Sequence, residues 1–236
     1  MKRLILSIAL FLSLLAVNAQ PFESYVYKSN GLGYGALYNW WAATDARGFV
    51  SGWHVPTKTE KETLVTYLGG FDTGEGDKLK ETGLTYWVSP NTGATNEFGF
   101  NARGSGIRNT NGINTAFFND MKVNFIVWTS TAINATNSYG FQCHSSVSNI
   151  SLTNAPNKIG QAIRLIKDDS TDPGTVTIDG DVYNTVTIGT QVWLASNLKA
   201  THYANGDPIT NVTDNTAWSL LVTGAYCWYG NDIGNK

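Results

Sequence analysis

The clearest periodic pattern of hydrophobic positions lies in the segment HVPTKTEKETLVTYLGG. Leu64, Val65 and Leu68 recur at helical spacing and share one face. Thr57 precedes this run, and Glu60 lies three residues after Thr57, which is the spacing of a capping box. The sequence therefore predicts a helix that begins after Thr57 and stops at the pair of glycines that closes the segment.

Two further segments have helical features. The stretch 216–222 (TAWSLLV) predicts a short helix, for which Asp214 or Thr216 supplies the N-cap. The stretch 34–44 (YGALYNWWAAT) fits two interpretations. Its apolar positions match helical spacing, whereas its aromatic richness suits a buried strand.

Most remaining hydrophobic runs are short and predict strands. Residues 174–198 alternate around Asp179-Gly180, a dipeptide typical of a hairpin turn. The other predicted strands are 98–103, 125–131, 138–145 and 162–168. The tracts 109–119 and 131–157 are rich in Asn, Ser and Thr, and we interpret them as surface loops. The fold class expected is α+β, with short twisted antiparallel sheets, one or two helices and long loops.

The first residues indicate export. Lys2 and Arg3 precede a short apolar run, and small residues around Ala19 suit cleavage, so residues 1–19 predict a signal peptide. The alternative is a membrane anchor, but the run is shorter than the ~20 residues that cross a bilayer. We therefore expect a secreted or cell-surface bacterial protein with no membrane span once the signal peptide has been removed.

The charge balance and composition narrow the class of partner. Without Lys2 and Arg3, 14 basic residues face 18 acidic ones, a net charge of −4. No basic stripe of the kind that binds phosphate backbones is evident, so we expect no nucleic-acid partner. Few charges and abundant aromatic, Gly, Asn and Thr residues are typical of a β-rich extracellular domain.

Several motifs together resemble one family. YGALYNWWAAT, GWHVPTKTEKETLVTYLGG, GDKLKETG, NEFGFNARGSGIRN, WTST and AIRLIKD occur in the order found in the Fibrobacter succinogenes major paralogous domain. The tail, IDGDVYNTVTIGTQVWLASNL through YCWYGND, is similar to the opening of the same domain. The resemblance implies a C-type-lectin-like fold related to the formylglycine-generating-enzyme superfamily.

The order of these parts differs from the family, because the family's opening third comes last. We interpret residues 20–236 as one circularly permuted domain: 25–167 is the family's C-terminal part, 168–174 a linker and 175–236 its N-terminal part. One alternative is two incomplete tandem domains divided near residue 170. Another is a tail that completes a neighbouring molecule.

Few residues suggest catalysis or metal binding. Cys143 and Cys227 allow one disulfide, although a buried thiol is an equally open interpretation. His54 is expected to pack or hydrogen-bond where the first helix begins, and no histidine has a neighbour at zinc-ligand spacing. We expect no enzymatic activity and no cofactor. Calcium has weak support, since the acidic residues Asp72, Glu75 and Asp77 offer three oxygen ligands and a solvated acidic loop is the default.

The tryptophans and the polar loops have different expected roles. The eight tryptophans lie almost entirely within family-like motifs, which favours core packing over a sugar-stacking platform. The loops are interpreted as a recognition surface for an extracellular glycan or protein, and the alternative is a structural or adhesive surface module without a discrete ligand. The expected ligand-binding residues are Arg108, Asn109, Asn111, Asn114, Asn134, Asn137, Tyr139, Asn149 and Asn154.

Overall fold

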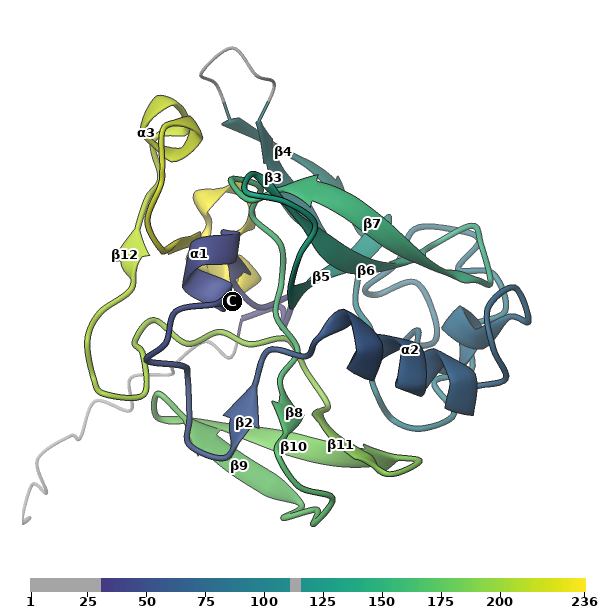
Figure 1. Cartoon of the computed structure of the whole chain (residues 1–236). Coiled ribbons are helices and arrows are strands. Elements are labelled where there is room, and N and C mark those ends of the chain that lie inside the picture. Colours follow the sequence, from purple (N-terminus) through teal and green to yellow (C-terminus); the bar gives the residue numbers. More distant parts are fainter. Residues whose placement is uncertain (1–30, 111–115) are drawn as a thin grey trace, which may run out of the picture.

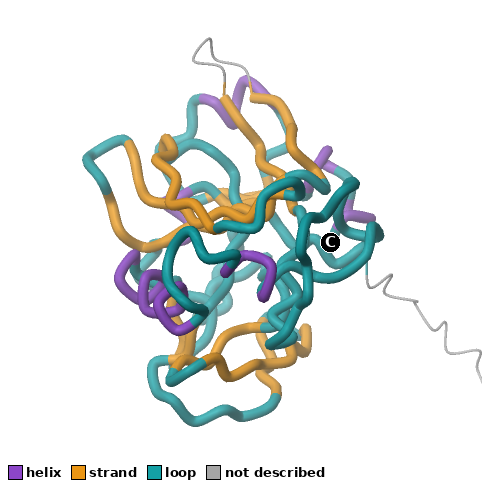
Figure 2. Tube along the Cα trace, turned by 90° about the vertical axis from the view of Figure 1, so that its right-hand side faces the viewer, coloured by secondary structure: helices purple, strands orange, loops and turns teal. Residues whose placement is uncertain are grey.

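The computed structural model describes residues 31–110 and 116–236. Within them the chain forms small, mostly antiparallel sheets with few helices, which confirms the α+β class (Figure 1). Strands gather in an upper and a lower group, and loops fill much of the remaining volume (Figure 2). The predicted signal peptide, residues 1–19, lies outside the described residues. No helix in the described ranges is both long and apolar enough to cross a membrane.

The lower group is a five-stranded sheet in the order β2-β8-β11-β10-β9. Its strands are β2 (Trp53–His54), β8 (Ile166–Lys167), β9 (Thr175–Ile178), β10 (Asp181–Ile188) and β11 (Gln191–Leu194). The predicted hairpin joins β9 to β10, and its turn residues Asp179 and Gly180 have φ angles of 49° and 76°. This positive-φ pair is the conformation that a two-residue hairpin turn requires.

The upper group contains two sheets. One pairs β3 (Ser105–Thr110) with β4 (Ala116–Met121), and the other has the order β5-β6-β7. Strands β5 (Asn124–Ala132) and β6 (Asn137–His144) were predicted, whereas β7 (Ile150–Pro156) occupies part of a tract interpreted as loop. That interpretation was wrong for β7, because β6 supplies a continuous antiparallel partner from Cys143↔Ile150 to Asn137↔Pro156. The loop interpretation of residues 109–119 was likewise wrong for β4, because this strand pairs with β3.

A fourth sheet joins the two ends of the described chain. It has the order β1-β13-β12, from β1 (Leu37–Tyr38), β13 (Ala225–Cys227) and β12 (Thr210–Asn211). The yellow C-terminal strands lie beside the purple helix α1 (Trp40–Ala43) in Figure 1. The backbone N–H of Gly33 donates to the carbonyl of Lys236 at 2.7 Å, so the last residue contacts the first described segment.

The helices follow their local signals. Helix α2 (Lys58–Tyr67) begins at Thr57, whose side chain accepts from the N–H of Glu60 in the predicted capping box. Helix α3 (Asn215–Ser219) is capped by Asp214. The ambiguous stretch 34–44 contains both a strand, β1, and a helix, α1. Short 3-10 turns are η1 (Glu75–Lys78), η2 (Tyr229–Asn231) and η3 (Ile233–Asn235).

Two predicted strands did not form as expected. Residues 98–103 are irregular, because Gly99 and Asn101 have φ angles of 69° and 53°, outside the range of an extended strand. The segment 162–168 is a strand only at β8. Residues 168–174, interpreted as a linker, form an exposed connection between β8 and β9.

Three clusters of buried residues form the interior. The largest combines residues from both halves of the chain, including Tyr38, Trp128, Tyr226 and Trp228. A second lies beneath α2, and a third, smaller one surrounds Trp218. Six of the tryptophans are at most 7% exposed, which confirms their predicted core role; Trp40 and Trp41 are half-buried.

Candidate functional site

Four of the predicted ligand-binding residues lie together at one end of the β5-β6-β7 sheet. Asn134 is in the turn before β6, Asn137 and Tyr139 are on β6, and Asn154 is on β7 in register with Tyr139. The Asn137 side-chain N–H donates to Asn154 Oδ1 at 2.7 Å. We call these four residues the asparagine patch.

The turn within the asparagine patch is held by its own side chains. Asn134 Oδ1 accepts from the backbone N–H groups of Thr136 and Asn137 at 2.9 and 3.0 Å. Thr129 Oγ1 donates to the Tyr139 carbonyl at 2.9 Å, and Lys58 Nζ lies 5.5 Å from the Tyr139 ring centroid. Asn134 and Asn154 are exposed, so a fixed arrangement of amide groups faces solvent.

The other predicted residues lie elsewhere. Asn149 precedes β7 at the far end of the sheet, where its amide contacts Asp72 at 3.1 Å. Asn109 is half-buried on β3. Asn111 and Asn114 lie outside the described residues.

Arg108 was predicted to bind a ligand at the surface, but it is a structural residue in the interior. It is 0% exposed, and its guanidinium lies 4.4 Å from the Trp218 ring centroid. It donates to the carbonyls of Thr213 and Asp214 at 2.8 and 3.1 Å and to Asn215 Oδ1 at 2.9 Å. Arg108 therefore anchors the segment that leads into α3.

The acidic loop is organised by protein contacts. Glu75 is buried and accepts from the N–H groups of Thr73 and Ile150. Lys80, also buried, donates to the carbonyls of Thr92 and Val147 at 2.6 and 2.8 Å. Its Nζ also lies 3.1 Å from Asp77 Oδ1. The Lys80 ammonium thus occupies the place among these oxygens where a bound cation would lie.

No metal cluster accompanies these groups. Among the residues that the structure describes, no three or more His, Cys, Asp or Glu side chains are placed to hold a metal ion. His54 hydrogen-bonds Glu60 at 3.0 Å and Asp168 at 2.6 Å, which confirms its role at the start of α2.

The two cysteines are free and buried, and they lie in different clusters, Cys143 beneath α2 and Cys227 beside Trp218. Burial raises the pKa of each thiol to about 12. The structure therefore favours the buried-thiol interpretation over the disulfide.

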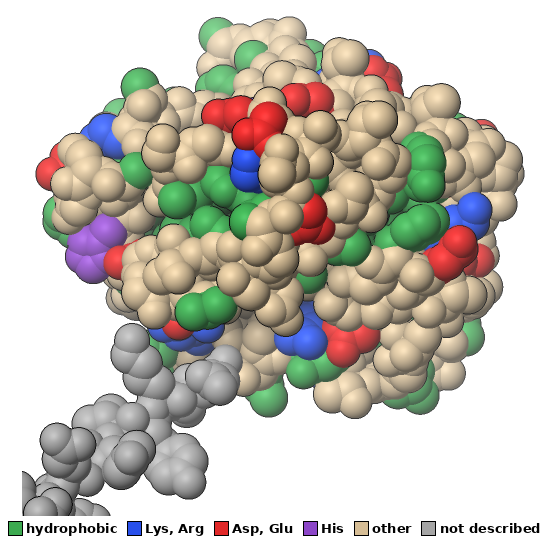
Figure 3. Space-filling model, turned by 90° about the horizontal axis from the view of Figure 1, so that it is seen from below, with side chains coloured by type: hydrophobic (Ala, Val, Ile, Leu, Met, Phe, Trp, Pro, Cys, Tyr) green, Lys and Arg blue, Asp and Glu red, His purple; other side chains and the backbone are tan. Residues whose placement is uncertain are grey.

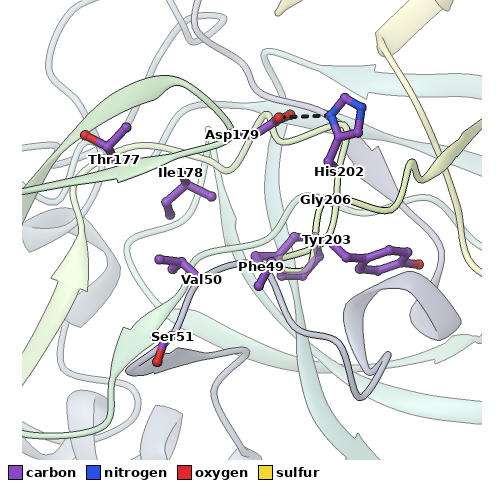
Figure 4. Close-up of a pocket in the computed structure, with 10 residues that line it drawn as sticks. Phe49, Val50, Ser51, Thr177, Ile178, Asp179, His202, Tyr203 and Gly206 are labelled. Atoms are coloured by element: carbon purple, nitrogen blue, oxygen red, sulfur yellow. Dashed lines mark hydrogen bonds and ion pairs between the residues drawn. The ribbon is translucent and has the colours of Figure 1, made fainter.

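Two open hollows adjoin Tyr203, and neither was predicted from the sequence. One, of about 550 Å³, has Phe49, Val50 and Ile178 among its lining residues. Figure 4 shows Val50 and Ile178 opposite each other and His202 paired with Asp179, 2.9 Å apart. Burial would raise the pKa of Asp179, but hydrogen bonds from Thr201 and His202 outweigh it and lower the pKa.

The second hollow, of about 560 Å³, is lined by residues from three separate segments, including Trp41, Asp45, Arg47, Tyr203, Thr210 and Thr223. Local turn residues such as Asp45 and the Asn205-Gly206 pair were the only sequence signals nearby.

Seen from below, the molecular surface is mostly polar, with a central stretch of hydrophobic side chains recessed between polar rims (Figure 3).

Comparison with known proteins identifies the family. No curated protein and no solved structure matches this chain. The sequence model of the Fibrobacter succinogenes major domain matches residues 16–167, well over half of the chain, in the segment that carries α2 and the asparagine patch. The chain therefore belongs to the Fibrobacter succinogenes major domain family.

Proposed function

We propose that this protein is an exported, non-enzymatic binding module that recognises an extracellular glycan or protein through the asparagine patch. The observation that carries the proposal is the hydrogen bond between Asn137 and Asn154, which fixes neighbouring amides on the surface of two strands. Asn, Ser and Tyr side chains form adaptable hydrogen bonds at recognition surfaces. A rigid sheet that presents them reduces the entropy lost on binding.

The position of the patch favours an extended ligand. Its residues lie on a sheet and its connecting turn, outside the hollows around Tyr203. A glycan chain or a protein surface can contact several amides at once on such a surface. The runner-up function is a structural or adhesive surface module in which the same amides only keep the protein soluble.

We further propose a C-type-lectin-like fold that is circularly permuted relative to the family. Support comes from the β1–β13 pairing and from the β8–β11 pairing, each of which joins residues before 168 to residues after 174. A rearranged chain with residues 175–236 placed before residues 31–167 should then fold with the same cores. Failure of that chain to give a cooperative, dispersed spectrum would count against permutation.

A glycan array tests the binding function. We expect a reproducible signal with the wild-type protein that is lost in the triple variant N134A/N137A/N154A. Asn184→Ala is the matched control, because Asn184 is an exposed asparagine on β10 in another sheet. If glycans give no signal, a screen of extracellular proteins with the same variants follows. If neither screen gives a binding signal, the result favours the structural or adhesive surface module.

A further inference from the structure

The second hollow described above, between Trp41 and Tyr203, has walls that are held in place by hydrogen bonds. Its wall on the 203–210 side is a tight turn in which the Tyr203 N–H donates to the Asp207 carbonyl at 2.9 Å. The Ala204 N–H donates to the Gly48 carbonyl at 3.0 Å and so ties this turn to the loop after α1. These two loops are distant in sequence but form one continuous rim.

Three charged groups are locked on that rim. Arg47 donates from Nε and Nη2 to the two oxygens of Asp45, both at 2.8 Å, and from Nη1 to Asp207 at 2.9 Å. The guanidinium carbon lies 3.9 Å from the Tyr203 ring centroid, so the cation stacks on the ring. The hydrogen bonds from Arg47 hold the pKa of Asp45 below its ordinary value, so the carboxylate stays ionised at neutral pH.

The back of the hollow is equally constrained. Asn39 is 0% exposed, accepts from the N–H groups of Ala42 and Ala225, and donates to the Thr223 carbonyl at 2.7 Å. It thereby fixes the 223–225 segment against α1. A Cβ at Gly224 would approach the Tyr203 hydroxyl to 2.5 Å, so only glycine allows the close contact between these walls.

The chemistry of the lining selects the class of ligand. Three of the five N–H donors of Arg47 bind Asp45 and Asp207, and these three groups together carry a net negative charge, which disfavours an anionic ligand. Of the two carboxylates, Asp45 lines the hollow; it is 24% exposed and retains a lone pair for a hydroxyl donor. Half-buried Trp41 supplies an aromatic surface, whereas the Tyr203 ring is covered by Arg47.

We propose that this hollow binds a neutral saccharide unit. The carboxylate of Asp45 accepts a hydrogen bond from one of its hydroxyls, and the apolar C–H face of the sugar packs on Trp41. An aromatic wall with a few converging, pre-positioned polar groups is the usual composition of a small-ligand site. This site is separate from the asparagine patch and does not depend on it.

Ligand-detected saturation-transfer NMR tests the proposal with the methyl glycosides of glucose, galactose, mannose, xylose and N-acetylglucosamine. We expect saturable binding of at least one glycoside below about 50 mM. Trp41→Ala and Asp45→Asn should each weaken it about tenfold or more. Asp45→Asn keeps the shape of the side chain, and Arg47 keeps its hydrogen bond to Asp207, so this variant preserves the fold even if Trp41→Ala does not.

Two controls separate this inference from the proposed function. Tyr67→Ala removes a 57% exposed aromatic on α2, far from the rim in sequence, and should bind as wild type. The triple asparagine variant should also retain glycoside binding. No saturable binding by any glycoside overturns the inference, as does unchanged affinity in both Trp41→Ala and Asp45→Asn. Binding lost only in the triple asparagine variant overturns it too, while supporting the asparagine patch.

Discussion

The ammonium nitrogen of Lys61 lies 4.5 Å from the centroid of the Trp193 ring, in the cluster beneath α2. It is also 4.7 Å from the Phe141 ring centroid, and the side chain is 0% exposed. Among the described residues its Nζ has no hydrogen-bond partner. Burial, aided by the nearby Arg164 charge and opposed by Cys143 and Glu60, lowers the pKa of Lys61 to about 7.

Replacing this lysine should therefore stabilise the protein. The unfolded chain keeps a lysine pKa near 10.4, so between about pH 7 and 10 the unfolded state binds more protons and wild-type stability rises with pH. Lys61→Met removes the buried charge and should raise the free energy of unfolding at pH 7 by about 2 kcal/mol. Denaturant titrations of both proteins from pH 7 to 9.5 measure this difference, which should shrink as the pH rises.

Lys58→Met is the matched control for this experiment, because Lys58 is a half-buried lysine on the same helix. It should show no such pH-dependent difference. A Lys61→Met protein less stable than wild type at pH 7 would contradict the assignment of an uncompensated charge.

Lys80→Met should have the opposite effect. Lys80 is as deeply buried as Lys61, but its ammonium is surrounded by the carbonyls of Thr92, His144 and Val147 and by Asp77. Removing it leaves buried acceptors and a carboxylate without a donor, which should cost about 3–5 kcal/mol. Chemical denaturation checks this; equal effects of the two lysine substitutions would refute the distinction.

The two thiols should be inert in the folded protein. Both are buried, and their pKa values are raised to about 12, so little thiolate exists between pH 7 and 9. We expect no alkylation by iodoacetamide in native buffer and two modified cysteines in guanidinium chloride, read by mass spectrometry. A non-reduced sample with no modifiable thiol after unfolding would show instead that a disulfide forms.

Arg108→Met should loosen the tail locally. The guanidinium donates to backbone carbonyls of Val212, Thr213 and Asp214, so its loss leaves them unpaired at a cost of about 3 kcal/mol. Hydrogen exchange should accelerate first in residues 212–219 and less in α2. Uniform acceleration across the chain would indicate global destabilisation instead.

The elements predictable from sequence are those whose signals are local. Helix α2 was predicted because Thr57 and Glu60 cap each other within one turn, and the β9–β10 hairpin because Asp-Gly adopts the required turn. Strand β7 was missed because its apolar alternation ends after Ile150 and Leu152, where Asn154 takes the next position; β6 provides its partner.

The candidate sites depend on long-range contacts that the local sequence pattern does not reveal. Arg108 sits beside asparagines in the chain, yet its burial is decided by residues 212–218, about a hundred positions away. The second hollow, between Trp41 and Tyr203, is assembled from three segments, none of which carries a recognisable motif alone. Asn134, Asn137, Tyr139 and Asn154 were predicted as binding residues on a surface loop. The β6–β7 pairing brings them together, and their ligand-binding role stays a prediction.

The hydrogen bond from the Ala225 N–H to Asn39 Oδ1 joins groups 186 residues apart. Contacts of such long sequence separation form late in folding, because the intervening chain must first be ordered. The sheet beneath α1 therefore stays incomplete until residues 225–227 have been synthesised. Until then Leu37 and Tyr38 expose an unpaired strand edge, so the emerging chain depends on protection from aggregation for almost its whole length.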